Sequence, residues 1–177
     1  YWRPGKRVLD RRSKIPSIEL YEPYRQALEE ELKTVFESRE GFLYDVLRYH
    51  LGWVDQQGQP VSGSRPLNFQ SALALVSCAA LGGDYRTALP VAASVDLIVN
   101  FTLVHGDVQA GRAEPGDRPS IWWVWGPAQA INAGDGLHAL GRTTMIRLAQ
   151  NDVSADRVLR AARSLDFACV ALCEGQY

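Results

Sequence analysis

Two apolar stretches decide the fold class: FQSALALVSCAAL at residues 69–81 and TALPVAASVDLIVNFTLV at residues 87–104. Both are apolar on almost every face of a helix, which is typical of helices that have neighbours on most sides in a bundle. Gly82 and Gly83 follow the first stretch and can adopt the left-handed backbone that often ends a helix. Pro90 lies early enough in the second stretch to be tolerated in a first turn. The sequence therefore predicts two helices inside a helical bundle.

Apolar residues recur at helical spacing on both sides of this pair. Further helices are predicted at residues 17–36, 42–51, 127–147 and 155–174, with a short apolar run at 121–124 and loops at 52–66 and 106–120. Almost no alternating strand pattern is present, so we predict an all-α fold of about seven helices. Residues 1–16 hold six basic residues and one acidic residue. We predict a basic arm or tail there, either solvated or in contact with an acidic partner, ahead of a helical domain at residues 17–177.

Length, charge and cysteine content narrow the functional classes. The chain has 177 residues, 46% of them hydrophobic, which suits one domain with a sizeable core. Its formal net charge of -1 provides no overall field to attract nucleic acid or an anionic membrane. Cys78, Cys169 and Cys173 show no CxxC spacing, and an odd number of cysteines favours a reduced, cytoplasmic protein. Polar residues and a proline interrupt the longest apolar run, and the first residues show no secretory signal, so no membrane span is expected.

Five phrases of the sequence point to a known family. They are CAALGGD at residues 78–84, VDLIVNFTLVHGDVQAG at 95–111, RPSIWWVWG at 118–126, AQAINAGDGLHAL at 128–140 and CEGQY at 173–177. Together they resemble the trans-isoprenyl diphosphate synthases, the polyprenyl synthetase family. The resemblance implies an isoprenoid-synthase-type helical bundle, of which this chain holds the N-terminal half, and a dimer formed through helices of the bundle. It also implies isoprenoid diphosphates as substrates and Mg²⁺ as cofactor, because the ions neutralise the charge that develops on a diphosphate leaving group.

The charged motifs of that family are weakened in this sequence. Where the family has the aspartate-rich motif DDxxD, residues 106–110 read GDVQA and keep only Asp107. Where it has the arginine pair of RRGxPT, residues 115–116 are Pro-Gly. The family's GKxxRP phrase falls on PLNFQS at residues 66–71 or, after an insertion, on SRP at 64–66, and neither alignment restores the lysine. The second aspartate-rich motif would follow the last residue, so we expect it on a longer chain or on a companion chain.

Four residues are candidates for a cavity or diphosphate site: Asp96, Asn100, Asp107 and Gln176. The first three share one helical face with Leu103. Asp107 is the candidate magnesium ligand; alternatively it is a surface or capping carboxylate that needs no ligand. Asp96 and Asn100 either line the same cavity or form an internal hydrogen-bonded pair.

Other polar and aromatic residues are predicted to serve packing. The set comprises His105, His138, Asp135, Trp122, Trp123, Trp125, Cys169 and Cys173. The histidines lack a second ligand at metal spacing. The tryptophans are expected in the core or at an interface, with a cation-stabilising aromatic wall as the alternative. The two cysteines are four residues apart on a helix and are expected to be small buried apolar side chains.

Three functions are compatible with these patterns. A non-catalytic or regulatory subunit that pairs with an active prenyl diphosphate synthase explains why packing phrases persist while charged residues do not. An active Mg²⁺-dependent prenyltransferase or class I terpene synthase would need an altered metal site, completed by a missing C-terminal half. An isoprenoid-binding module would keep the apolar cavity and lose the diphosphate site.

Overall fold

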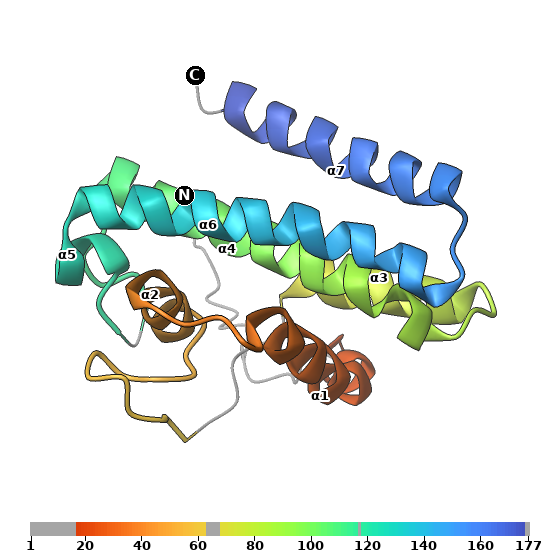
Figure 1. Ribbon diagram of the computed structural model, residues 1–177, viewed down its shortest axis with the longest axis horizontal. Coiled ribbons are helices and arrows are strands. Elements are labelled where there is room, and N and C mark those ends of the chain that lie inside the picture. The colour runs from red at the N-terminus through yellow and green to blue at the C-terminus, as the bar shows by residue number, and fades with distance from the viewer. Residues whose placement is uncertain (1–16, 63–67, 117, 176–177) are drawn as a thin grey trace, which may run out of the picture.

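Seven α-helices form the part of the chain that the computed structural model describes, residues 17–62, 68–116 and 118–175 (Figure 1). They are α1 (Ser17–Phe36), α2 (Phe42–His50), α3 (Phe69–Ala80), α4 (Leu89–Ala110), α5 (Ile121–Trp125), α6 (Pro127–Ile146) and α7 (Ala155–Glu174), joined by the 3-10 helices η1 (Tyr85–Ala88) and η2 (Arg147–Asn151). Across these ranges the one extended pairing is an isolated bridge between Val54 and Pro60. The all-α prediction is confirmed. The predicted basic arm at residues 1–16 lies outside the described residues.

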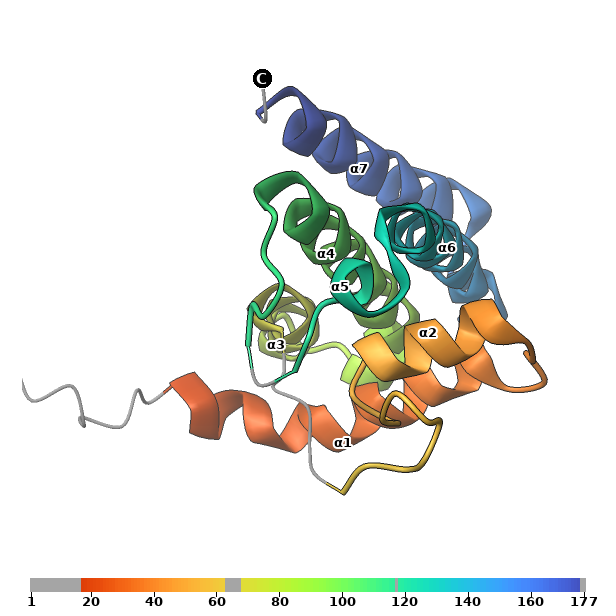
Figure 2. The ribbon, with the colours of Figure 1, turned by 90° about the vertical axis from the view of Figure 1, so that its left-hand side faces the viewer.

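The central helix is α4, and its position explains its composition. It contacts α1, α3, α5, α6 and α7, and Figure 2 shows these helices grouped around it. Ala92, Ala93 and Leu97 are completely buried. By length and composition, residues 85–110 are also apolar enough to cross a membrane, with a mean hydropathy of 1.7 over 18 residues, half of which are buried in the bundle. Packing on most sides accounts for that apolar composition without a membrane.

The carboxyl end of α4 lies further along the chain than predicted. The sequence pattern placed the end near Val104, with a loop from residue 106, but the helix continues to Ala110. Gly111 ends it with a left-handed backbone at φ 63°. Burial of Val104 and partial burial of Val108 against the core offset the low helix propensity of Gly106. The expectation of a loop at residues 106–110 was therefore wrong. These residues, which correspond to the aspartate-rich motif of the family, belong to the last turns of α4.

The helix α7 packs on one side only. Val158 and Cys169 are buried against the bundle, and burial raises the pKa of the Cys169 thiol. Cys173, expected to be buried, is instead exposed, and the main contacts of α7 are with α4, α6 and η2. Large apolar side chains remain exposed along the helix, namely Leu159, Phe167, Val170 and Leu172. In Figure 1 this helix forms the upper edge of the bundle.

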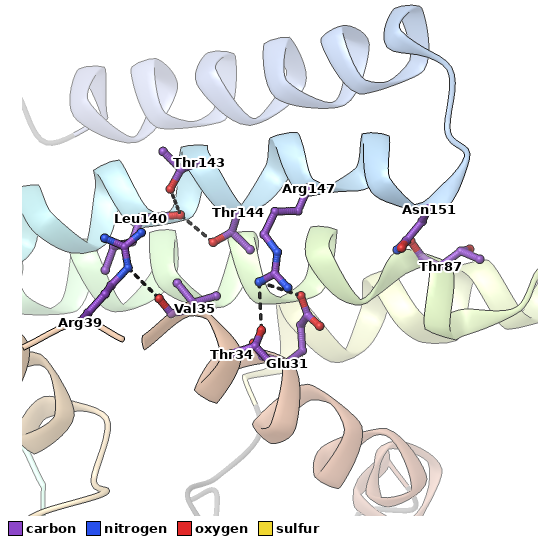
Figure 3. A network of polar contacts seen from close by, with 10 residues as sticks. All are labelled: Glu31, Thr34, Val35, Arg39, Thr87, Leu140, Thr143, Thr144, Arg147 and Asn151. Atoms are coloured by element: carbon purple, nitrogen blue, oxygen red, sulfur yellow. Dashed lines mark hydrogen bonds and ion pairs between the residues drawn. The ribbon is translucent and has the colours of Figure 1, made fainter. Parts of the chain in front are cut away.

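An ion pair fastens α1 to the end of α6. Nη1 of Arg147 lies 3.2 Å from Oε1 of Glu31 and donates to Oγ1 of Thr34 at 3.0 Å (Figure 3). The Glu31 side chain is only 15% exposed, so its charge is poorly solvated. This contact joins segments more than a hundred residues apart.

We expect Arg147→Met to lower the free energy of unfolding by about 1–2 kcal/mol, because it leaves the half-buried Glu31 carboxylate without its cation. The measurement is urea denaturation followed by circular dichroism. Arg160→Met is the matched control, since Arg160 pairs with Asp156 on the exposed face of α7 and should change stability by no more than about 0.5 kcal/mol. Equal losses in the two variants would contradict a special role for the Arg147 pair.

Candidate functional site

A cavity of about 780 Å³ lies where α2 ends, α3 begins and α4 meets the loop that follows it. Its polar lining includes His50, Asn68, Asn100, Asp107, Arg112, Arg118 and Ser120. Leu51, Val61 and Leu103 add apolar surface. A concave site of this volume, with a few polar groups among apolar walls, is typical of small-molecule binding. The chain thus gathers residues up to seventy positions apart around one space.

Asp96 and Asn100 form the predicted internal hydrogen-bonded pair. Nδ2 of Asn100 donates to Oδ1 of Asp96 at 2.9 Å. Asp96 is completely buried and also accepts from Nδ2 of Asn68 at 3.0 Å and from Oγ of Ser71 at 3.1 Å. Asn100 lines the cavity, with its Oδ1 3.0 Å from Nε2 of His50, whereas Asp96 lies outside the lining. Asp96 therefore joins α3 to α4, and Asn100 presents that network to the cavity.

Asp107 lines the cavity but is not the surface carboxylate that the sequence pattern favoured. It is only 7% exposed, because the continuation of α4 carries it into the bundle. Its Oδ1 accepts from Nε of Arg112 at 3.0 Å. The carboxylate that the family resemblance made a candidate metal ligand is thus neutralised by a residue five positions further along the chain.

Gln176, the fourth candidate, lies outside the described residues, as does the SRP phrase at residues 64–66. The alternative alignment of the lysine–arginine phrase, residues 66–71, places Asn68 and Ser71 in the site region. Both side chains are used to hold Asp96. That part of the sequence therefore serves a structural network.

Two arginines of the site were missed by the sequence analysis. Arg112 and Arg118 both lie in the segment between α4 and α5 and both line the cavity. Nη1 of Arg118 donates to the backbone oxygen of Tyr49 at 2.8 Å, and its guanidinium lies 5.6 Å from the centre of the Tyr49 ring. Two basic residues in a loop rich in Gly and Pro, just after a family motif that keeps one carboxylate, could have indicated these arginines.

His105 and His138 make packing contacts between α4 and α6, as predicted. Nε2 of His105 lies 3.1 Å from the backbone oxygen of Ile131, and the ring packs edge-on against Phe101. His138 packs on the other side of the same phenyl ring. Asp135, predicted to brace the helices, has a carboxylate oxygen 3.7 Å from Nε2 of His105 but is largely exposed. These residues help α4 and α6 to pack together.

The tryptophan cluster divides between core and surface. Trp122 and Trp125 pack against the main core, and Trp125 meets the ring of Tyr49 edge-on. Trp123 is 60% exposed. Trp122 and Trp125 are therefore core residues, as expected, and for Trp123 the interface alternative stays a prediction.

The described lining does not fit a magnesium ion. Mg²⁺ requires an octahedral set of oxygen ligands and is held in proteins by carboxylates. Asp107 is the one acidic residue among the described lining residues, and Arg112 already occupies its Oδ1. No group of three or more His, Cys, Asp or Glu side chains within the described ranges comes close enough to hold a metal ion.

The helical bundle and the polar cavity at the carboxyl end of its central helix agree with the isoprenoid-synthase-type fold that the sequence resemblance implied. The profile of the family described as "Polyprenyl synthetase" matches residues 63–177, and the chain belongs to this family. Its sequence is 40% identical over 146 residues to a geranylgeranyl diphosphate synthase of Mycobacterium tuberculosis, covering 82% of this chain and 41% of that protein.

Solved structures agree with this assignment. The crystal structure of a polyprenyl synthetase from Streptomyces coelicolor A3(2) superposes with a TM-score of 0.80 at 33% identity, covering 90% of this chain and 46% of that one. A geranylgeranyl pyrophosphate synthetase of Geoglobus acetivorans gives a TM-score of 0.74 at 26% identity, over 89% and 47% of the two chains. The chain spans about half the length of these relatives or less, and its partial coverage fits the N-terminal half of the fold.

Proposed function

We propose that this chain is a degenerate polyprenyl synthetase-type subunit of isoprenoid biosynthesis, which pairs with an active prenyl diphosphate synthase and does not ionise diphosphates alone. One observation carries the proposal: at the family's first aspartate-rich motif a single carboxylate remains, and it is held in an ion pair with Arg112. A single carboxylate that is already paired with an arginine does not supply enough negative charge to displace the hydration waters of Mg²⁺. Ionisation of a diphosphate depends on that metal charge.

The pairing partner is supported by what the scaffold keeps and exposes. The phrase AINAGD still performs close helix packing, since Gly134 lies directly against the ring of His105. The exposed apolar side chains of α7 form a surface of the kind that marks protein contacts. Relatives have about as many residues again as this chain matches. We infer a cytoplasmic homo- or hetero-oligomer in which further helices cover α7.

The alternative is an active Mg²⁺-dependent prenyltransferase or class I terpene synthase with an altered metal site. It is favoured by the cavity itself, which retains Asn100 and Asp107 in its lining. It is also favoured by the relatives, which are named as geranylgeranyl diphosphate synthases. This function requires carboxylates from outside the chain to complete the site.

The deciding experiment incubates the isolated chain with isopentenyl diphosphate, an allylic diphosphate and Mg²⁺, and measures prenyl product by mass spectrometry. We expect no product from the chain alone. Product formed by the isolated chain would contradict the non-catalytic role and support the alternative. Co-purification with an active synthase, with a changed product length in the mixture, is the result expected of a regulatory subunit.

Restoring the missing aspartates of the motif should restore Mg²⁺ binding. We expect Gly106→Asp with Ala110→Asp and Arg112→Ala to bind Mg²⁺ at least about tenfold more tightly than the natural sequence, because clustered carboxylates then face one space without a competing guanidinium. Isothermal calorimetry measures the affinity. The same double aspartate variant with Arg112 retained is the control and should bind more weakly. Absence of binding in the triple variant would mean that these helix positions do not converge on an ion.

A further inference from the structure

Gly106 and Arg112 are matched to each other at the carboxyl end of α4. A Cβ atom at position 106 would lie 3.3 Å from Nη2 of Arg112, tighter than most real Cβ contacts. Because Gly106 has no side chain, the guanidinium fits against the helix while its Nε donates to Asp107. Arg112 is thus the cation beside Asp107, and a side chain at position 106 would crowd its guanidinium.

Arg112 is held in place by its own backbone. Its N–H donates to the backbone oxygen of Asp107 at 3.0 Å, and its backbone oxygen accepts from Nε1 of Trp122 at 2.8 Å. The left-handed turn at Gly111 directs the chain between these two contacts. The side chain nevertheless remains 52% exposed. A guanidinium positioned before a ligand arrives loses little entropy on binding it.

Ser120 supplies an independent sign of a ligand. It lines the same cavity and is only 5% exposed, yet its Oγ has no hydrogen-bond partner within the described part of the chain. It occupies the N-cap position of α5 without making a side-chain cap bond. A buried hydroxyl without a partner costs free energy. A ligand oxygen in the cavity would satisfy it.

The charges of the described lining residues favour an anion. Arg118 is held at the cavity by the backbone oxygen of Tyr49, so two guanidinium groups line it. Asp107 is the one carboxylate in the described lining and is already paired with Arg112. The remaining positive charge and the serine hydroxyl suit phosphate oxygens, which arginine binds through two parallel hydrogen bonds.

We propose that this cavity binds a phosphate-bearing ligand without a divalent metal, with Arg112 as the cation in place of the ion and with Arg118 and Ser120 as further donors. This inference adds a ligand class to the proposed function and rests on one part of it, namely that Asp107 does not bind a metal ion. The recognition is a property of this chain's own side chains and needs no partner subunit.

The test titrates inorganic pyrophosphate into the full chain by calorimetry, first in EDTA and then with Mg²⁺ in excess. We expect binding in EDTA, with an affinity that does not rise when Mg²⁺ is added in excess, because Mg²⁺ complexes pyrophosphate and lowers its charge. Arg112→Gln should weaken binding by about tenfold or more, because it removes a charge-assisted contact. Ser120→Ala should weaken it by about threefold to tenfold without loss of thermal stability, because its hydroxyl makes no hydrogen bond within the described part of the chain.

Arg160→Gln is the control, since Arg160 also pairs with an aspartate but lies on α7, which contributes nothing to the described lining. It should bind pyrophosphate as the natural sequence does. Binding that requires Mg²⁺, no binding at all, or equal affinity in the Arg112 and Arg160 variants would overturn the inference. Product formation by the isolated chain would overturn the proposed function instead, so the two failures are distinguishable.

Discussion

Asp96→Ala is expected to lower the free energy of unfolding by about 3 kcal/mol or more, the largest effect of any change considered for this chain. Asp96 is completely buried and accepts hydrogen bonds from Asn68, Ser71 and Asn100. Alanine removes the shared carboxylate acceptor, leaves the fully buried Ser71 hydroxyl without that bond, and opens a cavity between α3 and α4, while Nδ2 of Asn100 keeps only its bond to the backbone oxygen of residue 96. Urea denaturation followed by circular dichroism measures the loss.

The control for this change is Asp135→Ala on α6. The Asp135 side chain is 69% exposed and lies 3.7 Å from Nε2 of His105, so its removal should alter stability by no more than about 0.5 kcal/mol. Asp96→Asn should fall between the two, since an amide keeps the shape and one acceptor but places an NH₂ group against a donor. If Asp96→Ala proved as harmless as Asp135→Ala, the network would not be what joins α3 to α4.

Gly134→Ala is expected to cost about 2–3 kcal/mol, because α4 and α6 approach each other too closely for a methyl group there. A Cβ at this position would overlap Nε2 of His105. The ring can escape only by leaving the backbone oxygen of Ile131 and the face of Phe101. Thermal and urea denaturation give the loss.

Gly136→Ala is the matched control two residues along the same helix. Its Cβ would meet Leu43 at 3.5 Å, an ordinary contact, so the gain in helix propensity should leave stability unchanged or raise it by about 1 kcal/mol. Adding His105→Ala to Gly134→Ala removes the colliding ring and should recover part of the loss. A Gly134→Ala protein as stable as the Gly136→Ala protein would show that the two helices can move apart freely.

The family phrases predicted the scaffold well because they describe local packing. The run of small and apolar residues in α4 needs neighbours on most sides whatever their identity, and the ends of α3 and α7 were predicted within a residue. The pairing of Asp96 with Asn100 followed from their separation by four residues on one helix. Each of these inferences uses spacing along one segment, which helix geometry translates directly into space.

The site was predicted less completely because it depends on where separate segments meet. Because α4 was expected to end before residue 106, Asp107 was predicted to lie at the surface. The helix continues to Ala110 because Val104 and Val108 pack against the core. The contact of His50 with Asn100 and that of Arg118 with Tyr49 join residues fifty or more positions apart. No periodicity along the chain indicates such contacts.

The order of residues alone therefore established the helical architecture, the family and the loss of the clustered carboxylates, since all three are properties of short segments. The folded bundle decided which charges face one another. It placed Arg112 against Asp107 in the room left by Gly106, and it buried Ser120 at the same cavity without a partner in the described part of the chain. The reason is physical: helix formation depends on neighbours in sequence, whereas the neutralisation of a buried charge depends on neighbours in space.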